Sequence, residues 1–137
     1  MFFPNFPIVD IAATREFWTS LGYSFNPDYS AEDVACLAFT DEVAVMLHEP
    51  SSFARFLPEG SAPADPRATT IGMFAFDLAS REAVDELFER VVAAGGSAAR
   101  PTEDLGFMYT RSFRDLDGIV WEPFFMDTSA YPGPDAG

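Results

Sequence analysis

Glu122 and Arg111 are the residues whose types and spacing first suggest chemistry. Alternation along residues 119–125 places Glu122 on a largely apolar strand face, beside Val120 and Phe124. A carboxylate in such surroundings can act as a general acid or base when burial raises its pKa, so Glu122 is the candidate catalytic residue. Arg111 lies on the preceding predicted strand and is the expected ion-pair partner, with a solvated Arg111 at the rim as the alternative.

His48 is the single histidine of the chain and ends a predicted strand over residues 43–48. A histidine at a strand end is typical of a structural residue, although a bulge could bring it beside Glu122 as a metal ligand. The sequence contains no Gly-rich phosphate loop, no nucleophile elbow and no Cys–His pair at a plausible spacing. Covalent catalysis by serine or cysteine is therefore not predicted.

The charge balance excludes several classes of partner. The chain has 22 acidic and 8 basic residues, a formal net charge of −14, and every basic residue is arginine. Nucleic acids and anionic membranes require a cationic patch, so neither is predicted as a partner. Residues 1–10 do not resemble a signal peptide, and no apolar stretch reaches the ~20 residues of a membrane span. We expect a cytoplasmic protein whose single cysteine, Cys36, is a reduced, buried thiol.

The elements that must position these residues follow one order twice. Each half reads as a strand, a helix and three strands, with helix caps predicted at Asp10 and Ser80. A connector rich in proline and glycine separates the halves. The predicted strands span residues 2–9, 23–26, 34–40, 43–48, 70–76, 97–100, 107–113 and 119–125.

The two halves also share residues. The run IVDIAATREF resembles FAFDLASREA, which aligns Asp10 with Asp77, and the HEP that begins at His48 is similar to the WEP that begins at Trp121. Agreement of residues and element order predicts an internal duplication.

A duplicated unit whose second half carries D-x-D-G-x-x-x-E at residues 115–122 resembles the vicinal oxygen chelate superfamily, which includes glyoxalase I, extradiol dioxygenases and bleomycin resistance proteins. Residues 106–127 look especially like its uncharacterised glyoxalase-like members. The resemblance implies an α+β fold of two βαβββ modules that form a curved, mixed, eight-stranded sheet. It predicts one domain over residues 1–127 and a loosely ordered tail over residues 128–137; within the domain, module one spans 1–50, the connector 51–69 and module two 70–127.

Metal-dependent members hold their ion at four strand positions, which fall here on Phe3, Met46, Ile71 and Glu122. Among these side chains only Glu122 can bind a hard divalent cation, so the resemblance implies a degenerate metal site and no cofactor. A divalent metal held weakly by Glu122 and His48 is the alternative.

We therefore expect a glyoxalase-like protein that binds a small molecule in a largely apolar pocket and sequesters an antibiotic or a metabolite. A metal-dependent lyase, isomerase or dioxygenase is the alternative, and a domain that works through its dimer surface is a third; all three stay open. The resemblance also implies a homodimer. The candidate substrate-binding residues are Phe3, Asn5, Met46, His48, Ile71, Met73, Tyr109, Arg111, Trp121 and Glu122.

Overall fold

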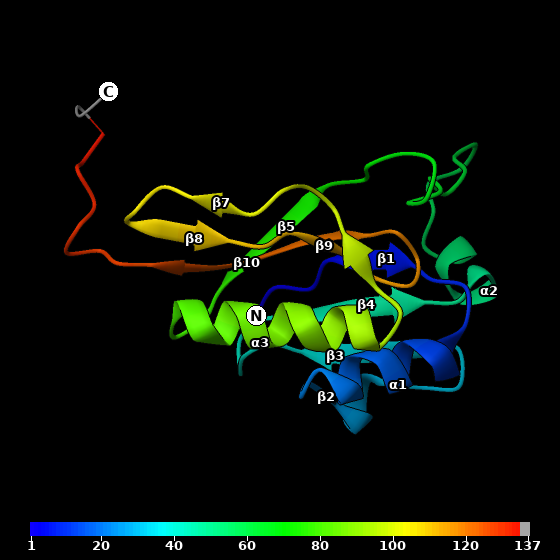
Figure 1. Cartoon of the computed structure of the whole chain (residues 1–137). Coiled ribbons are helices and arrows are strands. Elements are labelled where there is room, and N and C mark those ends of the chain that lie inside the picture. The colour runs from blue at the N-terminus through cyan, green and yellow to red at the C-terminus, as the bar shows by residue number, and fades with distance from the viewer. Residues whose placement is uncertain (135–137) are drawn as a thin grey trace. The chain divides into compact units, whose positions relative to one another are not determined.

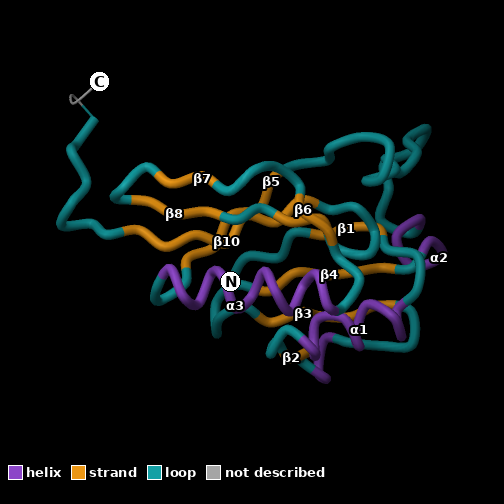
Figure 2. Tube along the Cα trace, in the orientation of Figure 1, coloured by secondary structure: helices purple, strands orange, loops and turns teal. Residues whose placement is uncertain are grey.

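The computed structural model describes residues 1–134. The chain divides into two compact units, and the boundary between them in the sequence lies after Ile71. Each unit consists of a sheet with one long helix against it (Figures 1 and 2). The α+β class is therefore confirmed. The described residues contain ten strands in two sheets rather than the eight in one sheet that we predicted. One extra strand, β7, forms in a segment expected to be a loop, and the predicted strand 107–113 is divided into β8 and β9.

The first unit is built on a four-stranded sheet with the order β1-β4-β3-β2, in which β1 runs parallel to β4. Asp10 begins the long helix by accepting a 2.8 Å hydrogen bond from the Ala13 amide. The elements are β1 (Asn5–Pro7), α1 (Ile11–Ser20), β2 (Ser24–Phe25), a 3-10 turn η1 (Pro27–Tyr29), β3 (Val34–Ala38), β4 (Ala44–His48) and α2 (Pro50–Ala54).

Strand alternation divides this sheet into two faces. Ala35 and Leu37 of β3 are fully buried on the face that α1 covers with Phe17 and Trp18. Residues of the opposite parity, among them Cys36, line a hollow on the other face. We call this other side the open face of the first unit.

The second unit has the sheet order β6-β9-β10-β8-β7, and β5 pairs in parallel with β10. Ser80 caps its long helix as predicted, since its hydroxyl accepts a 3.0 Å hydrogen bond from the Ala83 amide. The elements are β5 (Met73–Asp77), α3 (Arg81–Ala93), β6 (Ser97–Ala98), β7 (Glu103–Asp104), β8 (Met108–Thr110), β9 (Phe113–Arg114) and β10 (Val120–Met126).

The helix caps correct the alignment of the two halves. Asp10 caps α1, and its structural counterpart is Ser80, which caps α3, whereas Asp77 is the last residue of β5. The alignment of Asp10 with Asp77 is wrong, because the similar residues occupy different places in the fold. Asp10 directly precedes α1, whereas Asp77 still belongs to the strand before α3. With Asp10 aligned on Ser80, the counterpart of Phe3 is Met73, the first residue of β5, rather than Ile71.

The acidic motif at residues 115–122 forms the turn between β9 and β10. Asp115 Oδ1 accepts hydrogen bonds from the amides of Asp117 (2.9 Å) and Ile119 (3.0 Å), and Oδ2 accepts one from Trp121 Nε1 (2.8 Å). Burial raises the pKa of Asp115 to about 6, and these N–H donors limit the rise. Gly118 has a φ of 90°, which a side chain would strain. The turn therefore fixes the start of β10.

The chain beyond β10 stays in contact with the second unit. The Asp127 amide donates to the Phe107 carbonyl at 2.8 Å, and the Tyr131 ring lies 5.2 Å from that of Phe107. The end of the predicted tail, residues 135–137, lies outside the described residues. Among residues 1–134, no helix has the length and apolar character needed to cross a bilayer.

Replacing Asp115 with alanine should destabilise the fold by about 3 kcal/mol, because three buried N–H groups lose their acceptor. Urea denaturation at pH 7.5 measures the change. Asp41→Ala, in the exposed turn between β3 and β4, is the matched control and should change the free energy of unfolding by less than about 0.5 kcal/mol. Equal effects of the two substitutions would contradict the structural role of Asp115.

Candidate functional site

Glu122 lies on the face of the second sheet that points away from α3. Its Oε1 accepts a 3.0 Å hydrogen bond from Arg100 Nε and another of 3.0 Å from the Ser112 hydroxyl. The Glu122 side chain is 17% exposed, whereas Ser112 is buried. This carboxylate is therefore held in place by a cation on one side and by a buried donor on the other.

The predicted pairing of Arg111 with Glu122 is wrong. Arg111 Nη1 instead donates to Asp85 Oδ1 of α3 at 2.9 Å, and its guanidinium lies 3.9 Å from the Phe88 ring centroid. The register explains the difference, because the Arg111 amide pairs with the Pro123 carbonyl and places Ser112 opposite Glu122. A shift of one residue moves a side chain to the other face of a sheet.

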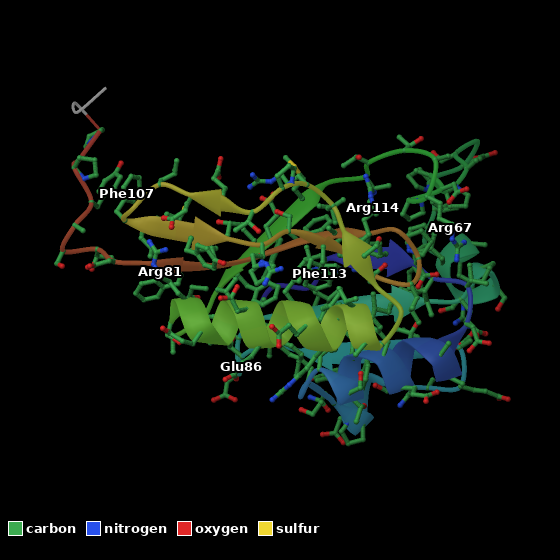
Figure 3. All side chains as sticks on the ribbon, in the orientation of Figure 1. Arg67, Arg81, Glu86, Phe107, Phe113 and Arg114 are labelled. Carbon is green, nitrogen blue, oxygen red and sulfur yellow. The ribbon has the colours of Figure 1, made fainter. Side chains whose placement is uncertain are left out.

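Two further predicted site residues share this helix-facing side. The Tyr109 hydroxyl donates to Asp85 Oδ1 at 2.7 Å, and Trp121 is buried with its ring 5.7 Å from Phe74. Arg81 lies at the start of α3, beside β8, where its guanidinium covers the Tyr109 ring (Figure 3). These contacts attach α3 to the sheet.

The remaining predicted residue of this unit, Met73, lies on the same face as Glu122. The register pairs Met73 with Val120 and Ala75 with Glu122, so these side chains have one parity. Met73 is 64% exposed, which leaves an apolar side chain open beside the Glu122 carboxylate. We call this side, with Met73, Ala75 and Glu122, the open face of the second unit.

In the first unit, His48 is buried at the end of a chain of hydrogen bonds. His48 Nε2 lies 2.8 Å from Asn5 Oδ1, and Nδ1 lies 2.8 Å from Ser52 Oγ. Arg55 Nη2 donates to Ser52 Oγ at 3.1 Å and pairs with Asp33 at 3.3 Å. The chain joins β1, β4 and α2, so it fixes α2 to the sheet.

The partners of His48 determine its tautomer. Asn5 Nδ2 donates to the Phe3 carbonyl at 2.8 Å, so Asn5 Oδ1 must accept a proton from His48 Nε2. His48 Nδ1 then has a lone pair, which accepts the Ser52 hydroxyl proton. Burial lowers the pKa of His48, with Asp33 opposing and Arg55 reinforcing the change. His48 is therefore neutral at pH 7.

Ser52 and His48 have the separation of a nucleophile and its general base, which the sequence analysis did not predict. Ser52 has no solvent exposure, however, and its oxygen accepts from Arg55. A nucleophile must reach its substrate, so this pair has a structural role rather than a catalytic one.

Two hollows lie within the first unit. A hollow of about 220 Å³ is lined by Asn5, Phe6, Pro7, Phe53, Ala64 and Ile71. Another of about 170 Å³ includes Phe3, Tyr29 and Cys36, and burial raises the pKa of the Cys36 thiol. Met46 pairs in register with Asn5 and is half-buried. Of the five predicted site residues of this unit, Asn5 belongs to β1 and Met46 and His48 to β4, while Phe3 precedes β1 and Ile71 precedes β5.

The donor set does not fit a divalent metal. Within residues 1–134, no group of three or more His, Cys, Asp or Glu side chains is arranged to hold an ion. Both ring nitrogens of His48 have protein partners, and Glu122 Oε1 accepts from Arg100 and Ser112. These contacts engage both ring nitrogens of His48 and one carboxylate oxygen of Glu122. Glu122 Oε2 therefore lacks the further protein ligands that a stable ion would need among the described residues.

Sequence analysis missed Arg100, Ser112 and Ser52. Ser52 lies in the first turn of α2, which begins two residues after His48, so a prediction of this short helix directly after the strand would have placed Ser52 near His48. Arg100 and Ser112 gave no signal, since their meeting with Glu122 depends on the β9–β10 register and on the path of the loop after β6.

Comparison with known proteins agrees with this geometry. A sequence model of the Glyoxalase/Bleomycin resistance protein/Dioxygenase superfamily matches residues 5–122. No curated protein sequence matches the chain. A hypothetical protein from S. aureus has a TM-score of 0.76 and 20% identity, covering 91% of this chain and 92% of its own.

Two further solved structures have the same fold. A glyoxalase-related enzyme from Fulvimarina pelagi has a TM-score of 0.74 and 21% identity, with 91% of this chain and 86% of that chain covered. The fosfomycin resistance protein FosX from Mesorhizobium loti has a TM-score of 0.66 and 14% identity, with coverage of 94% and 93%. At these identities the likeness shows the fold.

The His48 network predicts a loss of stability in acid. The unfolded chain binds the histidine proton near pH 6.5 and the folded chain binds it at lower pH, so the unfolded state holds more protons between these values. The His48 contribution should therefore fall as the pH drops below about 6.5. His48→Gln should cost about 1–3 kcal/mol at pH 7.5, and the difference from the parent should shrink by pH 5.

Urea denaturation of both proteins at pH 7.5 and pH 5 provides the comparison. The pKa of Asp115 is raised to about 6, so its contribution to the free energy of unfolding increases as the pH falls. This effect is common to both proteins and cancels in the difference. Ser52→Ala removes the donor to Nδ1 and should raise the His48 pKa, which an NMR titration of the ring protons would detect. A difference that does not change with pH would contradict the lowered pKa of His48.

Proposed function

Because the chain belongs to the Glyoxalase/Bleomycin resistance protein/Dioxygenase superfamily, we propose that it binds a small molecule without a catalytic metal ion. The observation that carries the proposal is the environment of Glu122. Its carboxylate accepts from Arg100 Nε and from the buried Ser112 hydroxyl, where a metal-binding site would leave it free to ligate.

Each unit, taken by itself, offers a surface that could bind such a ligand. In the first unit, the 220 Å³ hollow has mostly apolar walls, and Asn5 is the polar side chain among its lining residues. Asn5 gives one amide hydrogen to the Phe3 carbonyl and keeps a second donor for a ligand. The second unit offers Met73 and the polar group around Glu122. Apolar walls with few fixed polar groups are typical of small-molecule sites.

The proposal includes a use for the bound molecule. FosX from Mesorhizobium loti, one of the structures with this fold, is a fosfomycin resistance protein. Sequestration of an antibiotic or a metabolite by the present chain would require affinity and no reaction. This agrees with the protein hydrogen bonds that Glu122 and His48 already make. A homodimer and a cytoplasmic location belong to the same proposal.

Metal analysis tests it directly. Protein purified without chelator and dialysed against Mn²⁺, Ni²⁺ or Zn²⁺ should retain well under one ion per chain by inductively coupled plasma mass spectrometry, because displacing Arg100 from Glu122 costs the ion pair. Glu122→Gln should leave that content unchanged. Glu86→Gln, an exposed position on α3 (Figure 3), is the matched control.

Stoichiometric metal that is lost in Glu122→Gln and kept in Glu86→Gln would overturn the proposal. It would instead support the metal-dependent lyase, isomerase or dioxygenase of the same superfamily.

A further inference from the structure

Arg100 uses its guanidinium unevenly. Nε donates to Glu122 Oε1 at 3.0 Å, whereas Nη1 and Nη2 both lie 3.5 Å from one oxygen, Glu103 Oε2. A guanidinium fork binds a planar oxyanion best through two parallel N–H···O bonds to two oxygens, near 2.8 Å each. Nη1 and Nη2, the outer edge of the Arg100 guanidinium, therefore share a single acceptor oxygen, and both lie farther from it than an ideal hydrogen bond requires.

The two ends of this cluster differ in how firmly they are held. Ser112 is buried and donates to the oxygen that Arg100 Nε contacts, so the Glu122 end is attached to the sheet. The Glu103 side chain is 39% exposed and belongs to a two-residue strand, β7. Exposed ion pairs of this kind contribute only ~0–1 kcal/mol, so Glu103 can move into solvent at little cost.

The surroundings of Arg100 are suited to an apolar body. Phe124 has the parity of Glu122 on β10, and the exposed residues Met73 and Ala75 of β5 share this parity. The other arginines with ring contacts in this unit, Arg81 and Arg111, point to the α3 side. Arg114 pairs in register with Val120 and so has the parity of the open face, but its Nη1 donates to the Gly118 carbonyl at 3.0 Å. Arg100 is the cation that contacts Glu122, and this hydrogen bond raises the pKa of Arg100, so it stays charged.

We propose that Arg100 is the ligand-contacting cation of this protein and that its Nη1 and Nη2 atoms bind the carboxylate of a small molecule with an apolar body, in exchange for Glu103. The inference rests on the proposed small-molecule function and names its chemical class. The ligand carboxylate takes the place of the Glu103 carboxylate against the guanidinium, and Glu103 turns into solvent, so binding adds one negative charge to the protein. At physiological ionic strength, charges beyond about 8 Å are screened, which limits repulsion from the net charge of −14.

Benzoate is a suitable probe because it combines a carboxylate with a flat apolar ring, and benzyl alcohol is its neutral counterpart. The full chain, labelled with ¹⁵N, is titrated with each compound at pH 7.5, and the backbone amides of β10 together with the Arg100 Nε–H signal are followed by NMR. We expect benzoate to shift these signals saturably and to bind more tightly than benzyl alcohol.

Three variants separate a binding role from a structural one. Glu103→Gln removes the internal competitor and should raise benzoate affinity roughly threefold, which no purely structural role of Arg100 predicts. Arg100→Lys keeps the charge but loses the fork, so affinity should fall by about tenfold. Glu86→Gln on α3 is the control and should bind benzoate as the parent does. Because Arg100→Lys retains the ion pair with Glu122, loss of folding does not obscure the result.

Benzoate affinity that is unchanged in both Glu103→Gln and Arg100→Lys would overturn the inference. Saturable binding of benzyl alcohol without binding of benzoate would also overturn it while leaving the small-molecule function in place. Stoichiometric metal on Glu122, by contrast, would overturn the proposed function itself.

Discussion

The pleat of β10 is the constraint on which the second unit depends. Successive residues of a strand point to opposite faces, so burial of Trp121 beneath α3 forces Glu122 onto the other side of the sheet. A half-buried carboxylate there needs donors, and Ser112 and Arg100 supply them. The turn at Asp115 determines which residues of β10 face α3. Asp115 accepts hydrogen bonds from the Ile119 amide, just before β10, and from Trp121 Nε1.

The same rule organises the first unit. Leu47 of β4 is fully buried, which leaves its neighbour His48 on the opposite face among Asn5 and Ser52. A buried imidazole is stable only when both nitrogens are satisfied, and the directional chain from Arg55 to the Phe3 carbonyl does this with a neutral ring. The polar residues that stand out in the sequence are thus satisfied by the protein itself.

The internal hydrogen bonds of these polar residues bear on function. In a metal site, carboxylate and imidazole groups direct lone pairs that have no protein partner toward one position, where the ion binds. Glu122 and His48 instead have side-chain partners within their own units. Nη1 and Nη2 of Arg100 contact Glu103 only at 3.5 Å, and this loose contact is the observation on which the proposal of ligand recognition rests.

The sequence by itself determined the α+β class, the strand-then-helix start of each half, the caps at Asp10 and Ser80 and the family, because periodicity and capping are local properties. It also singled out Glu122 and His48. Only the tertiary structure decided their partners, since the one-residue register between β9 and β10 exchanges Arg111 for Ser112 opposite Glu122. Register and loop path depend on contacts between distant segments, which no local pattern in the chain encodes.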